Sequence, residues 1–250
     1  MNLRRAPRTL ASLFVTLVAL GLSAEALAGP PSAEAARPNP TLPAQVPAPE
    51  RVRFREIVED PSVSTKVNGD AFTARREVFE YLLDHPEFAS HVARMLRTAR
   101  YRIWRNAEGL QLDDGWGTVG HFDVVHSAEG LRVMYARGQY KARMLPDISG
   151  QAVVVIEYAY APAADGKSVV STAVTGFVRI DSRVLAAAGR VARPAAEAKA
   201  DKEAFRLVKV FAKTTRAIEE NPAGVYDQLR QRPGVPPREL EEFRQLLKIR

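Results

Sequence analysis

Hydrophobic and polar residues alternate through the middle of the chain, between Arg100 and Asp181. Such alternation is typical of β-strands, because successive side chains of a strand point to opposite faces of the sheet. Turn-forming residues separate the runs, so we expect neighbouring strands of one antiparallel sheet. The predicted strands cover residues 63–67, 101–105, 110–112, 116–126, 131–140, 152–160 and 168–180.

The last predicted strand has two clearly different faces. Ser171, Thr175 and Arg179 share one face, and the opposite face is mostly apolar. The apolar face carries Val170, Thr172, Val174, Gly176, Val178 and Ile180. We expect this face to point toward the core, because antiparallel sheets usually keep one buried and one wet face.

Apolar residues at helical spacing mark three further segments, at residues 74–83, 87–96 and 196–219. Thr73 is predicted to cap the first helix, and Pro86 opens the second. The third is long and amphipathic, and we expect its apolar stripe to face the sheet. That stripe contains Ala204, Leu207, Val208, Phe211, Thr215 and Ile218.

Four shorter features complete the element prediction. Residues 50–58 favour a loosely packed helix, and residues 182–191 favour a helix that Pro194 separates from the long one. Asn221 and the proline after it end the long helix. A final amphipathic helix carries Leu240, Phe243, Leu246 and Leu247.

This order of elements predicts an α+β fold of the helix-grip type. A curved antiparallel β-sheet is expected to wrap around the long C-terminal α-helix, with two short helices after the first strand. The predicted domain covers residues 50–220, and residues 221–250 form a C-terminal helical extension.

The N-terminus has the pattern of a secretory signal peptide over residues 1–28. Three arginines precede an uncharged apolar run at residues 10–22, and small residues at 26–28 place cleavage before Gly29. The run is shorter than the roughly 20 residues of a membrane span, although an uncleaved inner-membrane anchor stays open as an alternative. We therefore expect a periplasmic or secreted protein, with a Pro/Ala-rich linker at residues 29–49.

Composition excludes several kinds of chemistry. The 250 residues contain no cysteine, which rules out disulfides, thiol nucleophiles and cysteine-bound zinc. The net charge is +7, and losing three arginines and Glu25 with residues 1–28 leaves +5. This mild surplus fits an ordinary basic surface, or peripheral contact with an anionic membrane. No basic run with interleaved aromatics indicates nucleic-acid binding, and no phosphate-loop or dinucleotide motif indicates a cofactor.

One segment resembles a known superfamily. The chain reads Val-Phe-Glu-Tyr-Leu-Leu-Asp from Val78 to Asp84, followed by Pro86-Glu87-Phe88. Together with the element order over residues 63–218, this pattern is similar to the START-like superfamily, which includes polyketide cyclase-like domains. The resemblance implies a cavity between sheet and closing helix that binds a lipid or another apolar molecule.

Three residues are candidates for catalysis. His121 and Asp123 are two positions apart on a predicted strand and share a face, where a carboxylate orients an imidazole for general-base work. His126 is expected on the opposite face. Glu157 interrupts an apolar strand, either inside the cavity or on the solvent face. Surface pairs are the commoner reading, and without further ligands the His-x-Asp pair predicts no metal site.

Eight residues are candidates for ligand binding. Aromatic side chains with polar tips suit a pocket for a large apolar molecule, and an arginine inside the pocket suits an anionic headgroup. Both types also suit ordinary sheet packing and surface positions. The candidates are Trp104, Tyr135, Arg137, Tyr158, Tyr160, Arg179, Leu207 and Phe211.

These observations favour a binding protein over two alternatives. The first is a cyclase-like or aromatase-like enzyme that moves protons with His121, Asp123 or Glu157. The second is a structural envelope protein that docks through the helix containing residues 240–247. The missing nucleophile and phosphate motifs argue against a hydrolase.

Overall fold

The computed structural model describes residues 40–115, 117–140, 148–181 and 193–249. The predicted signal peptide, most of the predicted linker and the helix predicted at residues 182–191 lie outside these ranges. In the described part of the chain, no helix is both long enough and apolar enough to cross a membrane.

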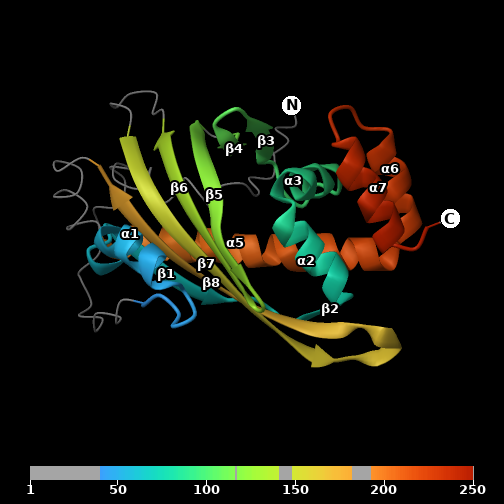
Figure 1. The fold of residues 1–250 in the computed structure, drawn as a ribbon, viewed down its shortest axis with the longest axis horizontal. Helices are drawn as coiled ribbons and strands as arrows, with labels where there is room; N and C mark the ends of the chain where they lie inside the picture. The colour runs from blue at the N-terminus through green and yellow to red at the C-terminus, as the bar shows by residue number, and fades with distance from the viewer. Residues whose placement is uncertain (1–39, 116, 141–147, 182–192, 250) are drawn as a thin grey trace, which may run out of the picture.

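Eight strands form one curved antiparallel sheet in the order β1-β8-β7-β6-β5-β4-β3, and β2 pairs with the far end of β8 (Figure 1). From β3 to β8 each strand pairs with the next along the chain, an order that antiparallel strands allow because short connections suffice to join them. The strands are β1 (Val63–Asn68), β2 (Phe72–Ala74), β3 (Arg102–Asn106), β4 (Gly109–Asp113), β5 (Thr118–Ala128), β6 (Leu131–Tyr140), β7 (Ile148–Pro162) and β8 (Ser168–Ile180).

Helices cover both faces of this sheet. The long helix α5 (Arg193–Glu220) packs on what we call the inner face, and α1 (Ala48–Glu59) packs on the outer face (Figure 1). The other helices are α2 (Arg76–Asp84), α3 (Pro86–Met95), α6 (Pro222–Arg230) and α7 (Pro237–Leu246). The predicted α+β fold, a curved antiparallel sheet around a long C-terminal helix, is confirmed.

Strand β7 shows how the two cores arise from one sequence. Val154 and Ile156 point to the inner face and pack with Ala204 and Val208 of α5. The alternate residues, Val153 and Val155, join the outer core beneath α1. Because both faces are buried at this point, residues 152–156 form a continuous apolar run.

The outer core also corrects the prediction of an extended linker up to residue 49. Leu42 and Val46 are buried beside Phe54 and Ile57 of α1, against the outer face of the sheet. Their apolar side chains, together with α1, shield the middle strands from water, so α1 is firmly packed and not loose. Packed residues of this domain therefore precede the predicted domain boundary at residue 50.

Thr73 corrects a second prediction, since it does not cap a helix. It lies in β2, paired with Val169, and helix α2 begins only at Arg76. The long β8 strand extends far enough to offer this segment backbone partners. That pairing outweighs the local preference of threonine for a helix cap.

A bulge in β5 corrects the predicted position of His126. The register shifts between Val124 and His126, so that His126 pairs with Val133. Val133 belongs to the outer core, which places His126 on the outer face, the face of His121. One extra residue in a strand reverses the alternation beyond it, and the sequence does not show where it falls.

The helix ends follow familiar backbone rules. Helix α5 begins at Arg193, so Pro194 lies in its first turn, where the missing N–H breaks no hydrogen bond. Asn221 separates α5 from α6, and its side chain accepts a hydrogen bond from Gly224 N at 2.9 Å.

The C-terminal segment 221–250 shares a third core with α2 and α3. Phe243 of α7 and Leu229 of α6 are fully buried against Val78, Phe88 and Val92. The apolar face of α7, considered above as a docking surface, is therefore covered by this chain's own helices.

Candidate ligand-binding cavity

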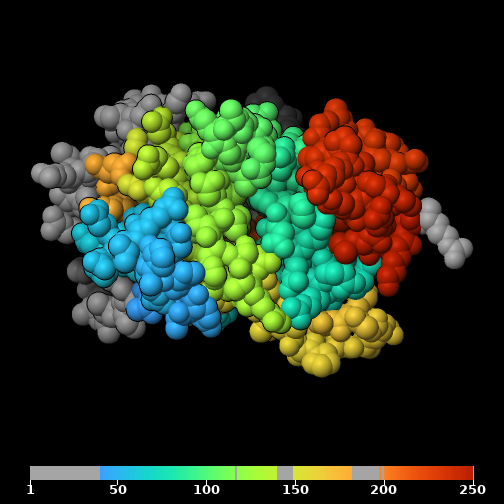
Figure 2. Space-filling view, viewed as in Figure 1, coloured from blue at the N-terminus to red at the C-terminus, as the bar shows by residue number. Residues whose placement is uncertain are grey.

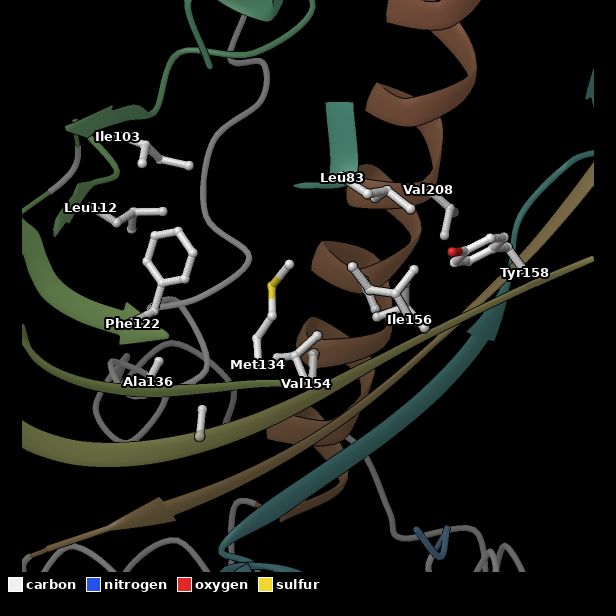
Figure 3. Close-up of a cluster of buried hydrophobic side chains, with 14 of the residues drawn as sticks. Leu83, Ile103, Leu112, Phe122, Met134, Ala136, Val154, Ile156, Tyr158 and Val208 are labelled. Carbon is white, nitrogen blue, oxygen red and sulfur yellow. The ribbon is translucent and has the colours of Figure 1, made fainter. Parts of the chain in front are cut away.

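A cavity of about 90 Å³ lies between the inner face of the sheet, the α2–α3 pair and α5. Figure 3 shows Phe122 and Met134 of the sheet beside this space, with Leu83 of α2 opposite. In Figure 2 the surface is hollowed between the middle strands and helices α2 and α3. The lining residues are Leu82, Leu83, Pro86, Ala89, Tyr101, Ile103, Leu112, Asp114, Phe122, Met134, Ile156, Leu207 and Phe211.

A smaller space of about 40 Å³ adjoins this cavity, between α2, α3 and α5. Thr214 and Thr215 of α5 add hydroxyl groups there, and Thr214 exchanges a 2.7 Å hydrogen bond with Thr98. The Thr215 hydroxyl is buried and has no partner. The two spaces share Leu82, Leu83, Ala89, Tyr101 and Phe211 as lining residues.

The break between α2 and α3 creates the mouth of the cavity. His85 ends α2 and Pro86 starts α3, because proline has no N–H to continue the first helix. The change of direction places Leu83 and Ala89 along the same opening. Ala89 has a small side chain, and the flexible side chain of Met134 lines the same cavity from the sheet. Packing between them therefore leaves free volume.

Among the described residues that line the larger cavity, two have polar side chains. Tyr101 lies just before β3, and Asp114 lies just after β4. An Asp114 carboxylate oxygen accepts a hydrogen bond from Thr118 N at 3.1 Å. Burial raises the pKa of the Tyr101 hydroxyl to about 12, so the phenol stays protonated at neutral pH.

Two predicted ligand-binding residues line the cavity. Leu207 and Phe211 project from α5 toward the sheet, as the apolar stripe of that helix predicts. Phe79 of α2 packs edge-on against Phe211, with 6.1 Å between ring centroids. The closing helix therefore supplies one wall.

Tyr158 and Tyr160 are on the inner face but do not line either space. The Tyr158 hydroxyl accepts a hydrogen bond from Arg132 Nη1 at 2.6 Å, and the Tyr160 hydroxyl donates to Glu80 at 3.2 Å. The Arg132 guanidinium also bonds the Asp84 carboxylate at 2.8 and 3.1 Å. These tyrosines fix the sheet to α2, so their prediction as ligand contacts is not supported.

Four other predicted ligand contacts lie on the outer face, away from the cavity. Tyr135 stacks on Phe54 of α1, with 5.5 Å between ring centroids. Arg179 donates to the backbone oxygen of Glu56 at 2.9 Å. The cross-strand row that starts at Trp104 passes through Gln111, His121, Arg137, Gln151 and Arg179. Residues that pair directly across two strands point to the same face of the sheet. Trp104, Arg137 and Arg179 therefore all lie on the outer face.

The three candidate catalytic residues also lie on the outer face. His121 Nε2 is 3.4 Å from an Asp123 carboxylate oxygen, and both side chains are partly exposed. Glu157 lies 4.0 Å from Lys66 Nζ, on the solvent side of β7. Within the described ranges, no three histidine or acidic side chains gather as metal ligands.

A larger depression on the outer face, about 1110 Å³, includes His121 and Arg137. It is open to solvent, and much of its lining is charged or amide side chains. Such a surface offers little apolar area to a ligand, so the smaller inner cavity is the better candidate for apolar molecules.

Tyr101 and Asp114 are the polar cavity residues that sequence reasoning missed. Tyr101 is the first residue of the strand predicted at residues 101–105, and Asp114 lies between the strands predicted at residues 110–112 and 116–126. A signal was present in the alternation: Tyr101 is two residues before Ile103, and Asp114 is two residues after Leu112. Both therefore have the parity of inner-face residues.

Comparisons with known proteins give no family. No protein-family model matches the chain, and no curated protein matches it. Among solved structures, a hypothetical protein from Helicobacter pylori matches with a TM-score of 0.39 and 8% sequence identity, over 65% of this chain and 92% of that one.

Proposed function

We propose that this protein is an exported, START-like binding protein that takes a small apolar molecule, or the end of an acyl chain, into the inner cavity. The observation that carries the proposal is the lining, in which eleven of the thirteen side chains are apolar. An apolar space with an opening and few polar groups is the usual form of a small-molecule site.

The size of the cavity limits the ligand. Pockets for drug-sized molecules measure roughly 300–1,000 Å³, and a dry engineered cavity of about 150 Å³ binds benzene. At about 90 Å³ the space is smaller than that cavity, so it suits a few methylene groups, or a single small ring once flexible Met134 shifts. A whole sterol or phospholipid would require Met134 and its neighbours to move.

Burial sets the expected affinity. A ligand that removes about 150 Å² of apolar surface from water gains about 4 kcal/mol, which corresponds to a dissociation constant near the millimolar range. Longer ligands gain more only if further surface is covered. Millimolar probe concentrations are therefore appropriate in a first test.

The predicted signal peptide supports binding in the periplasm or outside the cell, where the protein would carry or shield its ligand. The alternative of a cyclase-like enzyme has less support, since His121, Asp123 and Glu157 lie on the outer face. The docking alternative has less support too, because Phe243 of α7 is buried.

The test uses methyl NMR of methionine-labelled protein titrated with toluene. The Met134 methyl lines the cavity, whereas Met95 belongs to the separate core under α6 and α7 and serves as an internal reference. We expect toluene to shift the Met134 signal and leave Met95 in place.

An Ala89→Leu variant fills the mouth of the cavity and should abolish the toluene-induced shift without lowering thermal stability. Ala223→Leu, at an exposed position of α6, adds the same side chain away from the cavity and should bind as the unmodified protein does. An unmoved Met134 signal at saturating toluene would contradict the proposal.

A further inference from the structure

Tyr101 is the one tyrosine that borders both the larger and the smaller space. Its ring packs against Ala93, Ala99 and Val210, which fix it from the side of α3 and α5. Among the described residues, none forms a hydrogen bond with its hydroxyl. Tyr158 and Tyr160, by contrast, each have a partner on their hydroxyl.

The Tyr101 side chain is partly exposed, and it lines the space that a ligand would enter. A molecule that displaces water from the Tyr101 hydroxyl must replace the lost hydrogen bond, because an unpaired polar group costs about 1–3 kcal/mol. A bound molecule with a polar group at this point avoids that cost.

The lining also indicates which group this molecule carries. No lysine, arginine or histidine is present among the described residues that line either space. A ligand carboxylate or phosphate would lie near the Asp114 carboxylate, and none of these lining side chains would balance the charge of the ligand. Its desolvation cost would therefore be high. A hydroxyl or carbonyl group avoids this cost and matches a single phenol.

We infer that the ligand is an uncharged apolar molecule with one hydroxyl or carbonyl group, which forms a hydrogen bond with the Tyr101 hydroxyl. This inference rests on the proposed function and names the chemical class of its ligand. The apolar remainder lies against Phe122, Met134 and Phe211. Fatty-acid anions and phosphate headgroups are excluded from the interior.

The buried hydroxyl of Thr215 gives a second polar point in the smaller space. It lies on α5, one turn after Phe211, and it has no partner. A ligand group or a water molecule that reaches the smaller space would therefore meet the hydroxyls of Tyr101 and Thr215, which are not hydrogen-bonded to the described residues, beside the Thr214 hydroxyl that Thr98 already pairs.

The experiment compares three single-ring probes: toluene and phenol, which are nearly equal in size, and benzoate, which is larger and carries a negative charge. Dissociation constants are measured from the Met134 methyl shift for the unmodified protein and for Tyr101→Phe. Tyr226→Phe, on α6 outside both spaces, is the matched control. The Tyr101→Phe change removes one oxygen and keeps the ring, so the cavity keeps its shape.

We expect phenol to bind the unmodified protein at least as tightly as toluene, and benzoate not to bind. Tyr101→Phe should weaken phenol about tenfold, the loss that follows from leaving a buried hydroxyl unpaired, and should leave toluene unchanged. Equal effects on both probes, no effect on either, or benzoate binding as tight as that of phenol would overturn the inference. Failure of toluene itself to bind the unmodified protein would refute the proposed function, and the inference with it.

Discussion

At the scale of single residues, Arg132 is a nearly buried charged side chain that needs partners for its hydrogen-bond donors. Its side chain is 7% exposed, yet it carries a full charge on the inner face of β6. Five hydrogen bonds use its donors: two to Asp84, two to the backbone oxygens of Ala128 and Leu131, and one to Tyr158. The guanidinium thus links the β5–β6 hairpin to α2.

Asp84→Asn removes the charge that balances Arg132 and keeps the side chain's size. Breaking charge-assisted bonds to a buried guanidinium should lower the free energy of unfolding by about 2 kcal/mol, measured by urea denaturation. Asp227→Asn is the control, because its bond to Arg230 is exposed at both ends and should change stability by less than about 1 kcal/mol. Equal losses in the two variants would show that burial of Arg132 does not matter.

Side-chain alternation predicted which residues of a strand share a face, but not always which face is inward. In β8 the polar positions Ser171, Thr175 and Arg179 made the choice clear. In β7 both faces are apolar, because α1 covers one and α5 the other. The neighbouring strand β6 is also covered on both faces, so the sequence predicted Tyr135 at the cavity although its ring packs under α1.

At the scale of elements, one carboxylate joins three segments. Glu219, near the end of α5, accepts hydrogen bonds from Arg75 N and Arg75 Nε, before α2, at 3.1 and 3.0 Å. Lys167, in the β7–β8 hairpin, lies 3.0 Å away. Burial acts to raise the pKa of Glu219, but the Arg75 and Lys167 hydrogen bonds outweigh it, so the pKa lies below its usual range.

This lowered pKa predicts a pH-dependent contribution to stability. An unfolded glutamate titrates near 4.3, so the contribution is complete above about pH 5 and is lost as the pH falls through the lower folded-state pKa. Glu219→Gln should therefore cost about 1–2 kcal/mol at pH 7 and progressively less in acid, measured by urea unfolding across pH. Glu220→Gln, at the exposed neighbouring position, controls for the loss of charge. A stability cost of Glu219→Gln that does not change between pH 7 and pH 3 would contradict this role of the ionised Glu219 side chain.

Most helices and strands could be predicted from the sequence, but the residues at which some of them begin could not. Residues 72–74 form a strand only because the β7–β8 hairpin is long enough to pair with them, a contact that no local pattern shows. Leu42 and Val46 read as linker because prolines surround them, yet the uncovered outer face of the sheet gives them an apolar surface to join.

At the scale of the whole molecule, three cores are arranged around one sheet and one long helix. The third core, formed by α2, α3, α6 and α7, covers the outer side of the helices that form the cavity mouth. Its stability therefore affects the position of Leu82, which lines the cavity and belongs to this core. Element order predicted the sheet and its closing helix, but not that the tail would complete this core.

Phe243→Ala tests whether the tail is integral. Phe243 is fully buried between Phe88 and Tyr81, with ring centroids 5.1 and 6.2 Å away. Removing a buried aromatic ring should lower the free energy of unfolding by about 3–5 kcal/mol in a chemical denaturation experiment. Phe205→Ala, at an exposed position of α5, should cost much less. Similar small costs for both would mean that the tail packs independently of the domain.

The proposed binding function depends on the apolar cavity between the inner face of the sheet, the α2–α3 pair and α5. Its most direct test is a crystal structure under xenon pressure, because xenon enters apolar cavities and has no other requirement. We predict a xenon atom in contact with Phe122, Met134 and Phe211, and none at that position in Ala89→Leu. Crystals in which those side chains touch one another and exclude xenon would contradict the binding function.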